Sequence, residues 1–98
     1  MSVTATEQGN TVTINVTGRF DFSAHQEFIA AYRDLPKGEK EFVVDLSGTE
    51  YMDSSAMGML LQLREHASKS SQVSLVNANA NIQEILKIAN FDKLFNVS

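Results

Sequence analysis

Cysteine is absent from the chain, and histidine is scarce. Without a thiol, neither a disulfide framework nor a thiolate-ligated metal site can form. His25 and His66 are the only histidines, too few imidazole groups to favour a structural zinc site. The sequence therefore predicts a protein without a metal, and no motif in it indicates another cofactor.

Long apolar runs and basic clusters are absent as well. No stretch approaches the ~18 consecutive apolar residues of a membrane-spanning helix. The first residues lack the basic and apolar regions of a signal peptide, so we expect a cytoplasmic protein. Eight Lys and Arg stand against twelve Asp and Glu, which gives a net charge of −4. This pattern argues against nucleic acid as a partner and against insertion into a membrane.

The composition that remains is that of an ordinary globular protein, with 43% hydrophobic and 20% charged residues. A chain of 98 residues suits one domain. No repeat, low-complexity tract or linker divides it, so we expect residues 1–98 to form a single domain.

The first part of the chain changes from a strand pattern to a helix pattern. Apolar and polar residues alternate on both sides of Gly9-Asn10, which predicts a β-hairpin over residues 2–17. Helical spacing follows, which predicts a helix with Ser23 as its N-cap that ends near Pro36. The apolar positions are Val3, Ala5, Val12, Ile14 and Val16 in the hairpin, then Phe20, Phe22, Phe28, Ile29, Tyr32 and Leu35.

The middle of the chain alternates between strands and a helix. Residues 41–46 form a nearly continuous apolar run, which predicts a strand buried on both faces, with a loop at residues 47–49 after it. Good helix formers from Ser54 to about Ser68 predict a second helix. Residues 73–76 have the pattern of a short strand.

The last quarter is predicted to be helical. Asn79 is placed as the N-cap of a third helix, Asn90 as its C-terminal cap, and residues 91–95 are expected to pack their aromatic rings onto the domain. The resulting order ββαβαβα predicts an α/β fold. We expect one mixed β-sheet of about four strands with helices packed against it, and right-handed crossovers between parallel strands.

Candidate chemistry is concentrated between Tyr51 and Leu61. Asp53, Ser54 and Ser55 stand where a strand and its loop give way to a helix. The backbone N–H groups at a helix start lack partners and carry the positive end of the helix dipole, so a phosphate on a serine here would be stabilised. Simple N-capping favours the same residue types. Residue chemistry alone leaves both interpretations open.

The stretch from Val43 to Leu61 resembles the signature of the STAS family, the domain of bacterial anti-sigma-factor antagonists. That signature is an apolar strand ending in Asp-Leu, a short loop with an aromatic-apolar pair, then Asp-Ser-Ser(or Thr)-Gly-x-Gly and an apolar helix. Here it reads Val-Val-Asp-Leu-Ser-Gly-Thr-Glu-Tyr-Met-Asp-Ser-Ser-Ala-Met-Gly-Met-Leu-Leu. Gly18-Arg19-Phe20-Asp21 is similar to the Gly-x-Leu/Phe-Asp segment before the family's first helix, and the element order matches across essentially the whole chain.

The resemblance implies an interaction switch with no enzymatic activity of its own. In the family, a partner that is both serine kinase and anti-sigma factor phosphorylates the serine after the aspartate, and a PP2C-type phosphatase reverses the reaction. Carried over, this makes Ser54 the phosphoacceptor, with the partner bound when Ser54 is unphosphorylated and released when it is phosphorylated. Ala56 departs from the family pattern, which usually has Gly there. The partner-binding residues so implied are Asp21, Asp53, Ser54, Ser55, Ala56 and Met57.

Two other functions are open. A STAS subunit of a membrane lipid-transport ABC complex, docked on its ATPase, is compatible with the same fold. A small hydrolase or nucleotide-binding enzyme using Ser54 belongs to a different class. The chain has neither a Gly-x-x-x-x-Gly-Lys-Ser/Thr loop nor a Gly-x-Ser-x-Gly turn, which disfavours the enzyme.

Four more side chains have specific expectations. His25 and His66 fall on different helices in polar surroundings, so we expect both to be solvated. Asp45 is expected to accept a hydrogen bond from nearby loop amides. Gly58 lies within the second helix, where Gly costs about 1 kcal/mol relative to Ala, and close packing against the sheet or a partner would justify it.

Overall fold

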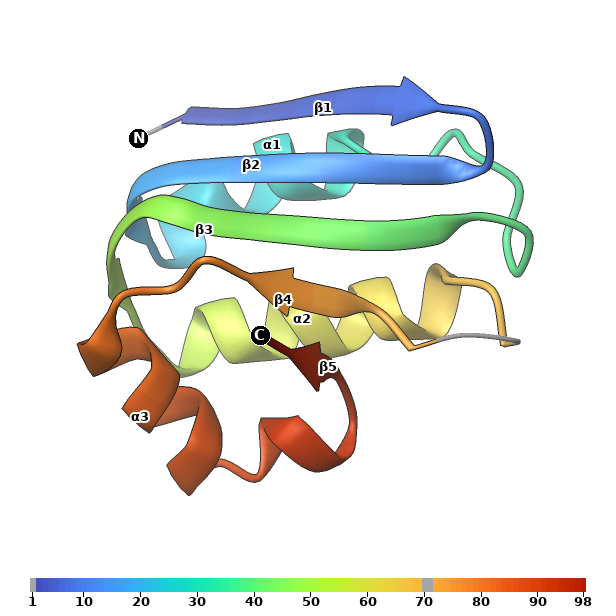
Figure 1. Ribbon diagram of the computed structural model, residues 1–98. Helices are drawn as coiled ribbons and strands as arrows, with labels where there is room; N and C mark the ends of the chain where they lie inside the picture. Colours follow the sequence, from blue (N-terminus) through green and yellow to red (C-terminus); the bar gives the residue numbers. More distant parts are fainter. Residues whose placement is uncertain (1, 70–71) are drawn as a thin grey trace.

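The computed structural model describes residues 2–69 and 72–98, and five strands form one sheet in the order β1-β2-β3-β4-β5 (Figure 1). β1 and β2 are antiparallel, and the other neighbours are parallel, so the predicted mixed α/β sheet is confirmed. The strands are β1 (Ser2–Gln8), β2 (Thr11–Phe20), β3 (Glu41–Met52), β4 (Ser74–Val76) and β5 (Asn96–Val97). The helices are α1 (His25–Ala30), α2 (Ser54–His66) and α3 (Ala80–Ile88), with 3-10 turns at η1 (Phe22–Ala24) and η2 (Phe91–Lys93).

A two-residue turn closes the β1–β2 hairpin as predicted. Gln8 lies opposite Thr11, and Gly9 between them has a φ of +62°. A positive φ at the first central position is the pattern of a type II′ turn, whose twist matches that of the flanking strands. Glycine adopts this φ without a steric penalty, so the sequence selects the hairpin locally.

The sheet has one strand more than the four expected. β5 is only two residues long, and it pairs in parallel with β4 through Ser74 opposite Asn96. The Asn96 amide donates to the Val73 carbonyl at 2.9 Å, and the Ser98 amide donates to Leu75 at 3.0 Å. Two residues show no alternation, which is why the pattern did not reveal this strand.

β3 continues through the predicted loop at residues 47–49, so that prediction is wrong. The β2–β3 register shifts twice, between Asn15 and Thr17 and between Gly18 and Arg19. At each shift β3 carries one residue more than β2, which is a β-bulge. The bulges allow β3 to stay paired with β2 through residues 47–49. Buried Thr49 fixes the arrangement, because its hydroxyl donates to the Val16 carbonyl at 2.7 Å.

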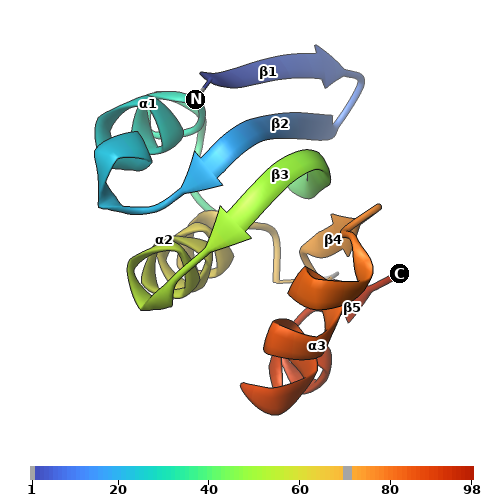
Figure 2. The ribbon, with the colours of Figure 1, turned by 90° about the vertical axis from the view of Figure 1, so that its left-hand side faces the viewer.

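The prediction that residues 41–46 are buried on both faces is also wrong. Phe42, Val44 and Leu46 are buried, whereas Val43 and Asp45 are half-buried. Figure 2 shows the reason, since α1 and α2 lie together on one side of β2 and β3. The opposite face of these strands is therefore the more open one.

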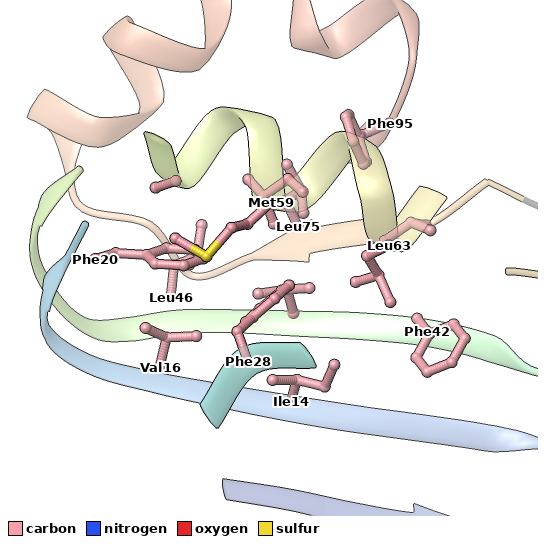
Figure 3. Close-up of a cluster of buried hydrophobic side chains, with 14 of the residues drawn as sticks. Ile14, Val16, Phe20, Phe28, Phe42, Leu46, Met59, Leu63, Leu75 and Phe95 are labelled. Carbon is pink, nitrogen blue, oxygen red and sulfur yellow. The ribbon is translucent and has the colours of Figure 1, made fainter. Parts of the chain in front are cut away.

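The core fills the space between the sheet and its helices (Figure 3). Alternate residues of β2 and β3 point into it, and α1 and α2 supply Phe28, Met59 and Leu63. Phe91 and Phe95 stack with ring centroids 5.1 Å apart and are both buried, so the predicted packing of residues 91–95 is confirmed. Buried Phe20 and Met52 extend this core to the carboxyl-terminal ends of β2 and β3.

The first helix begins differently from the prediction. Asp21, rather than Ser23, is the capping side chain, and it accepts hydrogen bonds from the Ser23 amide at 3.0 Å and from the Ser23 hydroxyl. The cap initiates η1, and α1 follows without a side-chain cap of its own. Ser23 therefore lies within the 3-10 turn and donates its N–H to the cap residue, so it is not itself the cap.

The other two helices begin as expected. Asp53 caps α2 and Asn79 caps α3. α3 ends at Ile88 with Ala89 as its C-cap, one residue before the predicted cap, and Asn90 is the left-handed residue that follows, with a φ of +61°. Within the described ranges, none of the helices has the length and apolar character needed to span a bilayer.

Candidate partner-binding site at the start of α2

β2 and β3 end side by side. Phe20, the last residue of β2, lies opposite Met52, the last residue of β3, and both are buried. Asp21 and Asp53 directly follow them, at the same edge of the sheet. Because the carboxyl ends of adjacent parallel strands meet there, the structure brings together the two segments that carry the predicted site residues.

The two aspartates hold the chain turns at this edge. The Asp53 side chain accepts from the Ala56 amide at 3.1 Å and so caps α2. Hydrogen bonds from the Ser23 hydroxyl and amide hold the pKa of Asp21 below its usual value, with a smaller contribution from Arg19 at 3.5 Å. Asp21 is thus ionised at neutral pH and adds negative charge beside the start of α2.

Ser54 is the first residue of α2, and its side chain is exposed. Ser55 and Met57 are half-buried, and Met57 packs against the core. Ala56 is fully buried, so a protein approaching this edge would meet its neighbours rather than its methyl group. The backbone at Ala56 is already tied to Asp53, which leaves the hydroxyl of Ser54 as the outermost group of the motif.

Two exposed aromatic side chains lie at the same edge of the sheet as the motif and were not predicted as site residues. Phe22 is 67% exposed and stacks on His25, with ring centroids 5.0 Å apart. Tyr51 is 40% exposed, and the Arg19 guanidinium lies 4.0 Å from its ring centroid. Helical spacing had placed Phe22 with the core residues. Its position directly after Asp21, in a turn that ends a strand, was the signal that could have separated it from them.

The outer surface of α2 is also exposed beyond Ser54. Gly58 and Leu61 are both exposed, and they lie about one and two turns after Ser54 on the same side of the helix. A Cβ added at Gly58 would meet no atom within 4 Å. Packing against the sheet therefore does not explain Gly58. We call Phe22, Tyr51, Met57, Gly58 and Leu61 the rim of Ser54.

Both histidines were expected to be solvated, but each is half-buried in the structure. His66 is not a solvated residue, because its Nε2 lies 2.8 Å from the Leu35 carbonyl and its ring meets the Tyr32 ring at 5.1 Å. His25 is half-buried beneath Phe22. The expectation for Asp45 is confirmed, since it accepts from the Ser47 amide at 2.9 Å, and this bond lowers the pKa of Asp45. Over residues 2–69 and 72–98, no three His, Asp or Glu side chains are grouped as metal ligands.

Comparison with known proteins identifies the family to which this fold belongs. A family described as the Mlab STAS domain matches residues 3–96. A STAS-domain-containing protein of Pseudomonas aeruginosa (strain UCBPP-PA14) is 46% identical over 101 residues, which covers 100% of both chains.

Two solved structures share the architecture. An anti-sigma factor antagonist from Mycobacterium paratuberculosis superposes with a TM-score of 0.80 and 19% identity, over 98% of this chain and 83% of the other. The anti-sigma factor antagonist SpoIIAA in its unphosphorylated form gives a TM-score of 0.67 and 19% identity, over 89% of this chain and 83% of the other. The family match over residues 3–96 and the 46% identity to a STAS-domain-containing protein lead to the same conclusion: the chain belongs to the STAS domain family.

Proposed function

We propose that this protein is an anti-sigma-factor antagonist whose binding to a partner is controlled by phosphorylation of Ser54. The observation that carries the proposal is the exposed Ser54 side chain at the first position of α2, with exposed Gly58 and Leu61 on the same side of the helix. The whole chain, residues 1–98, acts as one binding domain in this proposal, and it performs no chemistry itself.

The unphosphorylated rim suits a protein surface. Aromatic side chains and Met are enriched at protein interfaces, and Phe22, Tyr51 and Met57 supply them here. Bare backbone at Gly58 lets a partner approach the helix closely, because no side chain stands in the way. The partner would therefore cover the Ser54 hydroxyl together with the apolar rim.

Phosphorylation would change the charge at the centre of this surface. A phosphoserine adds about two negative charges at neutral pH. The N-terminus of α2 can accommodate them within the monomer, because its first N–H groups and the helix dipole favour an anion. A partner lying over the rim would instead bury the new charge beside ionised Asp21, which opposes binding.

The proposed partner is a protein that is both serine kinase and anti-sigma factor, with a PP2C-type phosphatase restoring the hydroxyl. The names of the two solved antagonists and the Asp53-Ser54-Ser55 motif support this assignment. Asp53 caps the helix that Ser54 begins, Ser55 lies beside Ser54, and Asp21 lies at the same edge. The charge of −4 and the missing basic cluster support a protein partner over nucleic acid.

Site-localising mass spectrometry on protein from its native cells tests the switch. We expect one phosphate on Ser54, lost in Ser54→Ala and kept in the matched control Ser55→Ala. Tagged Ser54→Ala should then retain a kinase-type partner that Ser54→Asp loses. Absence of phosphate under several growth conditions would contradict the switch. Equal recovery of a transport ATPase with both variants would instead identify a transporter subunit.

A further inference from the structure

We propose that β1 is a dimerisation edge, through which two copies of this chain pair their β1 strands antiparallel and form one continuous sheet. β1 is the terminal strand of the sheet and forms its outer border in both views (Figures 1 and 2). The proposal does not depend on the function of Ser54, because β1 contributes no residue to the rim.

The two edges of the sheet differ in how they are protected. β5 has two residues, and a short edge strand offers little to pair with. β1 has seven residues, with a register to β2 that runs unbroken from Ser2 to Gln8. Its sequence contains neither Pro nor Lys, which are the usual devices against edge pairing, and three of its seven residues are β-branched, namely Val3, Thr4 and Thr6. Among the strands that the structure describes, β1 is therefore the edge that is open to association.

The hairpin geometry defines which backbone groups are free. Gln8 and Thr11 flank a two-residue turn, so they form a hydrogen-bonded pair, and such pairs alternate along the ladder. The even-numbered residues of β1 consequently point their N–H and C=O groups toward β2. Val3, Ala5 and Glu7 point theirs to the outside. Among the residues that the structure describes, no strand pairs with this outer side.

This outer row is complementary to itself. A two-fold axis at Ala5 sets Ala5 opposite Ala5, Val3 opposite Glu7 and Thr4 opposite Thr6, with about six hydrogen bonds between the copies. The small side chain at Ala5 leaves room at the axis, and cross-strand Thr pairs are favourable.

Charge also permits a second copy as the partner. Glu7 is the only charged residue of β1, and Lys40 of the same subunit neutralises it at 2.6 Å. With the axis at Ala5, the two Glu7 residues do not face each other. A charged partner strand would have no unpaired charge on β1 to bind. A second β1 strand brings no unpaired charge of its own, and its outward N–H and C=O groups can pair with those of the first.

Sedimentation equilibrium of the purified full chain tests the proposal. We expect a reversible monomer–dimer equilibrium between about 10 µM and about 1 mM, the range of a small interface. Ala5→Pro removes one outward N–H and no β1–β2 bond, so it should weaken dimerisation at least about tenfold and leave the circular dichroism unchanged. Ala5→Lys, which places like charges at the axis, should have the same effect. Ala5→Val keeps the N–H group and serves as the matched control, with dimerisation kept or strengthened.

Amide hydrogen exchange provides a second measurement at the strand itself. The amides of Val3, Ala5 and Glu7 should become protected as the concentration rises, while those of Thr4 and Thr6 stay protected throughout. A chain that is monomeric at about 1 mM would overturn the proposal. So would a dimer that persists in Ala5→Pro and Ala5→Lys, since it would use another surface.

Discussion

Two strand–helix units follow each other in this chain, β3–α2 and β4–α3, and they differ at the first residue of the helix. Each helix has an Asx cap: Asp53 accepts from the Ala56 amide at 3.1 Å, and Asn79 accepts from the Ile82 amide at 2.9 Å. The residue after the cap is Ser54 in one unit and Ala80 in the other. Because α3 forms without a hydroxyl at this position, capping alone does not account for Ser54. The comparison thus favours the functional interpretation that the sequence left open.

The outer faces of the two helices differ as well. α2 exposes Gly58 and Leu61, about one and two turns after Ser54 and on the same side of the helix. The outer face of α3 is polar over its first two turns apart from Ala80 itself, and its exposed large apolar residue, Ile88, is the last residue of the helix. The polar residues exposed on α3 are Asn81, Gln83, Glu84 and Lys87. One unit therefore combines an exposed hydroxyl with an apolar surface, and the other does not.

The largest expected effects concern what the two units share, the core. Leu60 of α2 and Leu86 of α3 are both fully buried. Leu60→Ala and Leu86→Ala should each lower the free energy of unfolding by about 2–5 kcal/mol, because each leaves a cavity. Urea denaturation measures both, with the exposed Gln62→Ala as the control. A loss below about 1 kcal/mol for Leu86→Ala alone would show that α3 is peripheral to the fold and that the two units are not equivalent.

The caps separate stability from binding. Asp53→Ala and Asn79→Ala should each cost about 1 kcal/mol of stability, since each frees one helical N–H. Only Asp53→Ala should also weaken the partner complex of the Ser54→Ala protein, because α2 contributes residues to the rim and α3 contributes none. Asp53→Asn keeps an acceptor for the Ala56 amide and isolates the effect of the charge. Equal loss of binding in Asn79→Ala would break the distinction between the units.

Most of the fold could be predicted because its signals are local. The Gly9-Asn10 turn, the alternation along β2 and the Asn79 cap each act within a few residues, and all three are confirmed. The wrong predictions concern features that depend on contacts between residues far apart in the sequence. The passage of β3 through residues 47–49 depends on the bond from Thr49 to Val16, which joins positions far apart in the sequence. The environment of His66 depends in the same way on Leu35 and Tyr32.

The site was predictable as a motif but not as a surface. Asp53, Ser54 and Ser55 are contiguous, so their pattern is visible in the sequence. Phe22 reaches the same edge only because Phe20 pairs with Met52 in the sheet. An exposed aromatic ring and a buried one have the same spacing pattern, and only the packing of η1 distinguishes Phe22 from Phe20.

Gly58 offers a smaller effect of opposite sign, and α3 has no glycine to match it. Gly58→Ala should stabilise the protein by about 0.5–1 kcal/mol, because Ala is the better helix former and the added Cβ meets open space. The same change should weaken partner binding if the bare backbone is a contact. Thermal unfolding and partner titration, with Gln62→Ala as the control, measure the two quantities. A variant that is more stable and binds equally well would remove Gly58 from the rim.

The smallest expected effect is on stability and concerns Asp45, which joins the β3–α2 unit to the β4–α3 unit. Asp45 of β3 accepts hydrogen bonds from Ser47 and from the side chain of Asn77, which directly follows β4, and the Ser47 amide is the main cause of its lowered pKa. A carboxyl whose pKa is lower in the folded state stabilises the fold above its unfolded pKa of about 3.9, and this contribution is lost as the pH falls through the folded pKa. Asp45→Asn keeps an acceptor and removes the charge, so its deficit against the wild type should be present near pH 6 and shrink on acidification. Urea denaturation at several pH values, with exposed Asp34→Asn as the control for net charge, measures this deficit. A deficit that is independent of pH would mean that Asp45 joins the two units through packing and hydrogen bonds, and that its charge plays no part.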